Sequence, residues 1–183
     1  MKSEPLRNLL DPKENSSIYI TGGVIMRTFE ELQEIANNNG VSVIDNYHFD
    51  SQRIDGLCCD DTIAIASHLE NSSQKVCVLA EELAHYYTAS GDIIDQSNPN
   101  CRKQELDGRI MAYKQLVSLD DLISAHKNYC QNAHEVAEFL GVTDEFLQNT
   151  LNYYKSKYGC YTIVGNYIIS FDPVISISEY NIG

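Results

Sequence analysis

The sequence predicts an α+β fold in which a small antiparallel sheet packs on a helical bundle. Short runs rich in Val, Ile and Thr cluster within 41–66, which indicates strands. Apolar residues then recur at helical spacing over 72–158, and two strand-like runs flank Gly165-Asn166. With 183 residues and 43% hydrophobic content, the chain is long enough for one domain with a sizeable core.

The first predicted helix covers residues 28–38. Thr28 is placed to cap it, and Glu31 completes a capping box three positions later. Three short strands are predicted to follow as an antiparallel meander, with Asp60-Asp61 as the tight turn between the last two. These strands are 41–44, 54–58 and 62–66.

Helices dominate the next part of the chain. The first of these helices follows Ser72-Ser73 and runs to about Ala89, where Ser90-Gly91 ends it. Gly108 lies within the second helix, 102–116. Glycine there lowers the stability of the helix by about 1 kcal/mol relative to alanine, and it indicates close packing against another helix. The later predicted helices are 102–116, 120–128, 133–140 and 144–158.

The end of the chain is predicted to form a β-hairpin. Gly165-Asn166 is a two-residue turn signal between strands 161–164 and 167–170, and residues 174–180 form a candidate further strand. The expected organisation is an N-terminal arm, a core, a helical pair that completes the domain, and a C-terminal hairpin with a tail. The corresponding ranges are 1–27, 28–131, 132–159 and 160–183.

Composition excludes several classes of protein. The formal net charge of −13 repels phosphate backbones, so direct nucleic-acid binding is not expected. No apolar run approaches a membrane span, and the start of the chain has no long apolar segment, so neither a membrane protein nor a secreted one is expected. The start of the chain therefore favours the reducing cytoplasm. The six cysteines form no Cys-x-x-Cys pair, which disfavours a thiolate zinc site and a thioredoxin-type motif.

Residues 76–87 carry the pattern best suited to chemistry. Read as a helix, the stretch places Glu81 and His85 one turn apart, with Glu82 beside them. Two metal-ligating side chains at i and i+4, with a carboxylate directly after the first, have the layout of the zinc-protease motif His-Glu-x-x-His. Here the motif reads Glu-Glu-x-x-His, and a solvated acidic patch is the alternative interpretation.

A catalytic zinc site usually has three protein ligands and an open position for water. Glu81 and His85 would supply two of them, and Glu105 on the following helix is the best candidate for the third. Zinc lowers the pKa of its bound water to about 7, and Glu82 would then act as the general base.

Three segments follow one another in order along the chain, namely Leu79-Ala80-Glu81-Glu82-Leu83-Ala84-His85-Tyr86-Tyr87-Thr88, Gly91-Asp92-Ile93-Ile94-Asp95-Gln96-Ser97 and Arg102-Lys103-Gln104-Glu105. Together with residues 133–159, this ordered series resembles the ImmA/IrrE family of metallo-endopeptidases. The resemblance covers residues 28–159 and is to the short form carried by phages and mobile elements of Gram-positive bacteria.

The resemblance implies a zincin-like helix and a zinc-dependent protease that cleaves a helix-turn-helix repressor, and so acts as an anti-repressor of a phage or mobile element. Glu82 matches the catalytic glutamate of the family, His85 its second histidine ligand, and Glu105 the glutamate of the later helix. Glu81 departs from the pattern, because it stands where the family has histidine. A Glu/His/Glu set carries two negative charges, which leaves open a divalent ion other than zinc.

A second function class stays open, namely a catalytically silent module that binds and sequesters a transcriptional regulator. Residues 136–143 also resemble the corner of a helix-turn-helix. Asp144 and Glu145 begin the second helix, however, and their negative charge argues against reading DNA. These helices are expected to complete the core or to bind the partner protein, and the oligomeric state is left open.

Four other histidines and one cysteine are weaker candidates. His48 and His68 are expected at the surface, and His126 and His134 are expected to be surface or satisfied residues, since neither has a partner at ligand spacing. Cys101 lies four residues before Glu105, which would allow it to join a metal site, but no function is expected for it.

Overall fold

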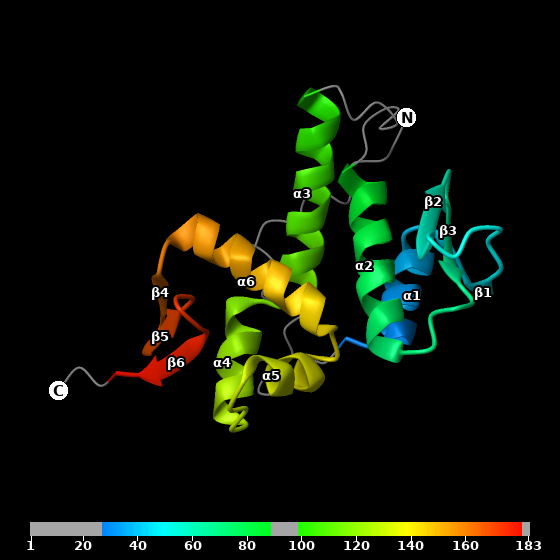
Figure 1. Ribbon diagram of the computed structural model, residues 1–183. Coiled ribbons are helices and arrows are strands. Elements are labelled where there is room, and N and C mark those ends of the chain that lie inside the picture. The colour runs from blue at the N-terminus through cyan, green and yellow to red at the C-terminus, as the bar shows by residue number, and fades with distance from the viewer. Residues whose placement is uncertain (1–26, 89–98, 181–183) are drawn as a thin grey trace.

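The structure, a computed structural model, confirms the α+β class (Figure 1). It describes residues 27–88 and 99–180, without the side chains of 99–102. The helices in these ranges are α1 (Phe29–Asn38), α2 (Ser72–Thr88), α3 (Pro99–Leu116), α4 (Leu119–Lys127), α5 (Ala133–Leu140) and α6 (Asp144–Tyr158). The strands are β1 (Ser42–Tyr47), β2 (Gly56–Cys59), β3 (Thr62–Ala66), β4 (Tyr161–Val164), β5 (Tyr167–Ser170) and β6 (Ser176–Glu179).

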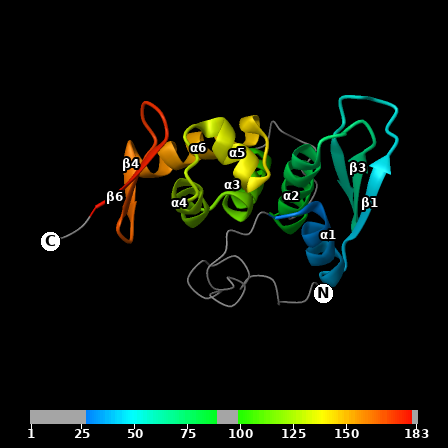
Figure 2. The same ribbon diagram turned by 90° about the horizontal axis from the view of Figure 1, so that it is seen from below.

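The elements are arranged as a row of layers. Figures 1 and 2 show the first sheet at one end, α1 and α2 beside it, the helices α3 to α6 next, and the second sheet at the far end. Helices α2 and α3 lie side by side in both views and are the most extensively packed pair of elements in the described chain. The described helices include none with the length and apolar character needed to cross a membrane.

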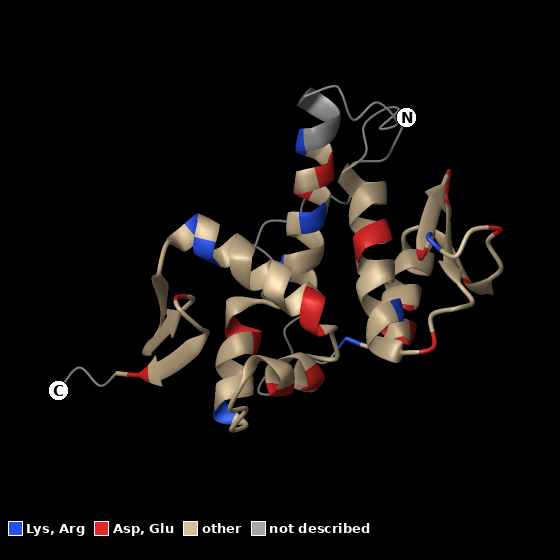
Figure 3. Cartoon of the chain, in the orientation of Figure 1, with Lys and Arg blue, Asp and Glu red and all other residues tan. Residues whose placement is uncertain are grey.

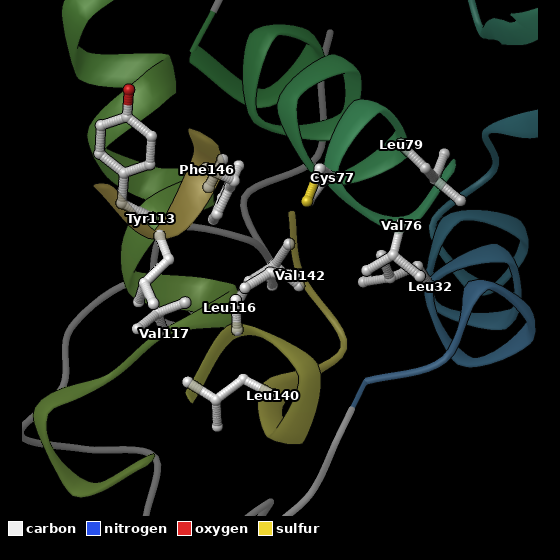
Figure 4. Packing of buried hydrophobic residues seen from close by; sticks show 14 of the residues in the cluster. Leu32, Val76, Cys77, Leu79, Tyr113, Leu116, Val117, Leu140, Val142 and Phe146 are labelled. Atoms are coloured by element: carbon white, nitrogen blue, oxygen red, sulfur yellow. The ribbon is translucent and has the colours of Figure 1, made fainter. Parts of the chain in front are cut away.

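A single cluster of buried apolar side chains joins these layers. Leu32 of α1 packs near Val76 and Leu79 of α2, and Val142 and Leu140 lie on the other side of α2 beside α3 (Figure 4). The cluster extends from the first sheet to the second without a break between separate cores. Both sheets and the helices between them are therefore stabilised by shared burial of apolar surface.

The predicted meander is wrong for one pair of strands. Strand order in the first sheet is β1-β3-β2, and β1 runs parallel to β3, with Ser42 opposite Thr62. β2 and β3 are antiparallel as predicted, and Asp60 adopts a positive φ of 51° in the turn between them. Alternation of apolar residues decides which face of a strand is buried, but it does not decide which neighbour the strand pairs with.

The helix signals in the sequence are confirmed by cap geometry. Thr28 and Glu31 form the predicted capping box of α1, and Thr143 caps α6 through the backbone N–H of Phe146. Gly141 ends α5 in the left-handed conformation. Residues 1–26 of the predicted N-terminal arm lie outside the described residues, as does the predicted end of the central helix at Ala89.

The predicted C-terminal hairpin is confirmed and has a third strand. β4 and β5 pair across Gly165-Asn166, and β6 adds to the other side of β5 in antiparallel register. Ile169 of β5 is fully buried, and the ring of Tyr167 lies beside His126 of α4 and below the ammonium of Lys127. The hairpin thus packs on the helical bundle through one face of β5.

The buried hydroxyl of Tyr154 gives a test of the packing between α6 and the residue that follows α3. It donates a hydrogen bond of 2.7 Å to the carbonyl oxygen of Val117. Tyr154→Phe removes that donor, and we expect the free energy of unfolding to fall by about 1–2 kcal/mol. Urea unfolding measures this loss, with Tyr129→Phe as the control, because the Tyr129 side chain is 82% exposed. Equal stability of the two variants would contradict the account.

Candidate functional site

The candidate site lies where the middle of α3 packs against the C-terminal end of α2, and Gly108 sets how closely the two helices approach. A Cβ atom at position 108 would lie 2.9 Å from His85 Nδ1 and 3.1 Å from Thr88 Oγ1. Real Cβ atoms essentially never come within 3.0 Å of another heavy atom. The predicted role of Gly108 in close helix packing is therefore confirmed, and the side chain that it accommodates is His85.

His85 and Glu105, predicted to share a site, lie together across this contact. His85 Nδ1 is 3.6 Å from Glu105 Oε2, and their side chains are 22% and 30% exposed. The other carboxylate oxygen, Glu105 Oε1, forms an ion pair with Nη2 of Arg109 one helical turn later, at 2.9 Å. Each oxygen of the Glu105 carboxylate therefore has a cationic or potentially cationic partner.

Glu81 lies one turn before His85 on α2 and faces the same charged group. Its side chain is half-buried, and burial is the main reason that its pKa is raised. Arg109 acts in the opposite direction and lowers the pKa, whereas Glu105 and Glu145 raise it further. Charges on α3 and α6 therefore act on one carboxylate of α2, and Figure 3 shows acidic and basic positions along these helices.

Glu82 faces a different neighbour, the strand β2. A Cβ atom at Gly56 would lie 2.9 Å from Glu82 Cγ and 3.2 Å from Glu82 Oε1, so the backbone of β2 passes directly over this side chain. Burial, followed by the negative charge of Glu81, raises the pKa of Glu82 to about 7, and hydrogen bonding by the Cys58 backbone partly offsets the rise. A carboxyl group with that pKa exchanges protons readily near neutral pH.

The donor types at this site fit a divalent ion. One imidazole and two carboxylates are ligands that zinc accepts, and they come from two adjacent helices. In the conformation seen, the structure brings His85 and Glu105 together, but residues 27–88 and 99–180 contain no group of three His, Cys, Asp or Glu side chains placed to hold a metal. The chemistry of the donors fits, whereas their present arrangement is that of an ion-pair network around Glu105.

The other histidines lie outside this site. His48 is exposed, His68 Nε2 lies 2.8 Å from Asp55 Oδ1, and His126 packs against Tyr167. His134 is exposed and pairs with Asp144 at 3.0 Å, which raises its pKa. The side chain of Cys101 lies outside the described residues.

Two residues of the site were not singled out from the sequence. Arg109 follows Glu105 by four positions, which is the spacing of a helical ion pair and was the available signal. Gly56 is the first residue of β2, and a glycine at the start of a strand does not indicate which side chain packs against it. Its contact with Glu82 depends on tertiary packing.

Comparison with known proteins identifies one family. The family model described as the IrrE N-terminal-like domain, a peptidase family, matches residues 31–152. This range includes α2, α3 and the strand β2, and therefore all the residues of the candidate site. No curated protein and no solved structure matches the chain.

Gly108→Ala tests the contact between α2 and α3. Alanine in a helix interior usually gains about 1 kcal/mol over glycine, but here we expect no gain or a loss in the free energy of unfolding, because the new methyl group meets the imidazole of His85. In the His85→Ala background the same change should be more favourable, because only the contact with Thr88 Oγ1 at 3.1 Å remains. Urea unfolding of the four proteins measures the coupling, and an equal gain in both backgrounds would contradict the close contact.

The raised pKa of Glu82 predicts how the stability of the metal-free protein depends on pH. The folded chain binds the proton more tightly than the unfolded chain, which releases it near the ordinary value of 4.5. Stability should therefore fall as the pH rises from 4.5 toward about 7. Thermal unfolding with a chelator present should show that the stability of Glu82→Gln falls less with rising pH than that of the wild type. The exposed Glu70→Gln serves as the control, and parallel curves for all three would refute this linkage.

Proposed function

We propose that this chain, which belongs to the metallopeptidase-like family of IrrE N-terminal-like domains, hydrolyses a peptide bond of a protein substrate where α2, α3 and β2 meet. The observation that carries the proposal is the convergence of His85 and Glu105, whose Nδ1 and Oε2 atoms are 3.6 Å apart. Glu81 lies on the same helix as His85, within the influence of the Glu105 charge. The site thus combines nitrogen and oxygen donors with a nearby carboxyl group of near-neutral pKa.

The residues that would hold a metal are Glu81, His85 and Glu105. Zinc is the ion implied by the resemblance, and the two carboxylates are also compatible with another divalent ion. When bound, such an ion would polarise the scissile carbonyl and make water a usable nucleophile at neutral pH.

Glu82 is proposed as the general base. With a pKa of about 7 in the metal-free chain, its carboxylate can accept a proton from the attacking water and donate it to the leaving amine. The backbone of β2 holds the side chain in place, because Gly56 leaves room for Glu82 and for no side chain of its own. A general base positioned in this way loses little entropy at the moment of reaction.

The edge of β2 is proposed to bind the substrate. β2 is at the end of the strand order β1-β3-β2, so an extended peptide could add to it as a further strand and pass close to Glu82. The proposed substrate is a helix-turn-helix repressor of a phage or mobile element, in the cytoplasm. A DNA-binding protein presents a basic surface, which complements a chain with a formal net charge of −13.

One observation favours a second function, that of a catalytically silent module that sequesters a regulator. Within the part of the chain that the structure describes, no three side chains are placed to hold a metal, and Glu105 is already paired with Arg109. A protein that keeps this arrangement would bind its partner without cutting it.

Incubation of the purified chain and zinc with the repressor encoded next to its gene tests the peptidase. We expect cleavage that a chelator stops and that Glu82→Gln slows by about 100-fold or more, because the general base is lost. Glu70→Gln, an exposed carboxylate away from the site, should cleave at the wild-type rate. Stable binding of the repressor without cleavage would favour the silent module, and equal cleavage by Glu82→Gln would exclude the proposed base.

A further inference from the structure

Arg109 is a cation placed within an acidic site. Its guanidinium Nη2 is 2.9 Å from Glu105 Oε1, and its side chain is 55% exposed. The other oxygen of Glu105 faces His85 Nδ1 at 3.6 Å. Arg109 also acts on Glu81 across the helix contact, so its charge reaches both of the carboxylates proposed as metal ligands.

Carboxylates that approach one another in a partly buried site repel, and a nearby cation reduces that cost. Glu81 is half-buried, and Glu105 and Glu145 both add negative charge around it. Among the charges that act on Glu81, Arg109 is the one described cation. In the metal-free protein the guanidinium therefore provides the positive charge that a bound ion would provide.

We propose that Arg109 is the internal counter-cation of the metal-free site and competes with a divalent ion for the Glu105 carboxylate. The inference rests on the proposed metal-binding role of Glu105. Two consequences follow from the geometry. The ion pair stabilises the metal-free protein, and the guanidinium must release Glu105 Oε1, or tolerate a second cation close by, when a metal binds.

Arg109→Gln tests both the stabilisation of the metal-free protein and the competition with a metal ion. Lys114→Gln is its matched control. Lys114 is an exposed cation on the same helix, for which the structure gives no contact with Glu105. We expect Arg109→Gln to raise the affinity for Zn²⁺ by about tenfold, measured by competition with a chromophoric chelator. The substitution removes the ion pair of Arg109 with Glu105, and it also removes the repulsion between the guanidinium and the metal ion. Lys114→Gln should bind Zn²⁺ as the wild type does.

The stability of the metal-free protein is a second readout. In excess chelator, Arg109→Gln should lower Tm more than Lys114→Gln does, and this extra loss should vanish in the Glu105→Gln background. An Arg109→Gln variant that binds Zn²⁺ no more tightly than Lys114→Gln, or whose Tm loss persists in the Glu105→Gln background, would overturn the proposal. Absence of Zn²⁺ binding by all variants would also overturn it.

A failure of the role proposed for Arg109 can be distinguished from a failure of the proposed peptidase activity. If Arg109→Gln binds Zn²⁺ more tightly but no variant cleaves the repressor, Arg109 is the counter-cation of a metal site that is not a peptidase. If the wild type cleaves the repressor and Arg109→Gln binds Zn²⁺ as Lys114→Gln does, the peptidase stands and the role of Arg109 is refuted.

Discussion

The close contact of α2 with α3 at Gly108 is the constraint on which the rest of the site depends. Position 108 has no room for a methyl group, because His85 Nδ1 and Thr88 Oγ1 occupy the space. This approach brings the imidazole of α2 within 3.6 Å of the Glu105 carboxylate on α3. A glycine that lowers helix propensity is thus placed where tertiary packing requires it, and the shared apolar core on both sides of α2 holds the helices in that position.

The electrostatics of the site follow from the same contact. Bringing Glu81 and Glu105 together concentrates negative charge in a partly buried place, and Arg109 lies where it reduces the resulting repulsion. Glu82 is adjacent in sequence but packs against the backbone of β2 at Gly56, where the charges of Glu81 and Glu105 still raise its pKa. The two consecutive glutamates therefore have different surroundings and are suited to different tasks.

Local signals allowed much of the fold to be predicted. The capping box at Thr28 and Glu31 and the turn at Gly165-Asn166 act over a few residues, so the sequence alone is sufficient to locate them. The parallel pairing of β1 with β3 was not predicted, because the choice of neighbouring strand depends on long-range packing. The contact between Gly56 and Glu82 is likewise tertiary, and it could not be found from either residue alone.

We propose that Glu81, His85 and Glu105 hold one divalent ion. The most direct measurement is the zinc content of the purified chain after equilibration with Zn²⁺ and removal of the excess, determined by elemental analysis. We expect a stoichiometric ion in the wild type and in Glu70→Gln, and loss of the ion in Glu105→Ala. Equal zinc in Glu105→Ala and the wild type, or none in the wild type, would contradict it.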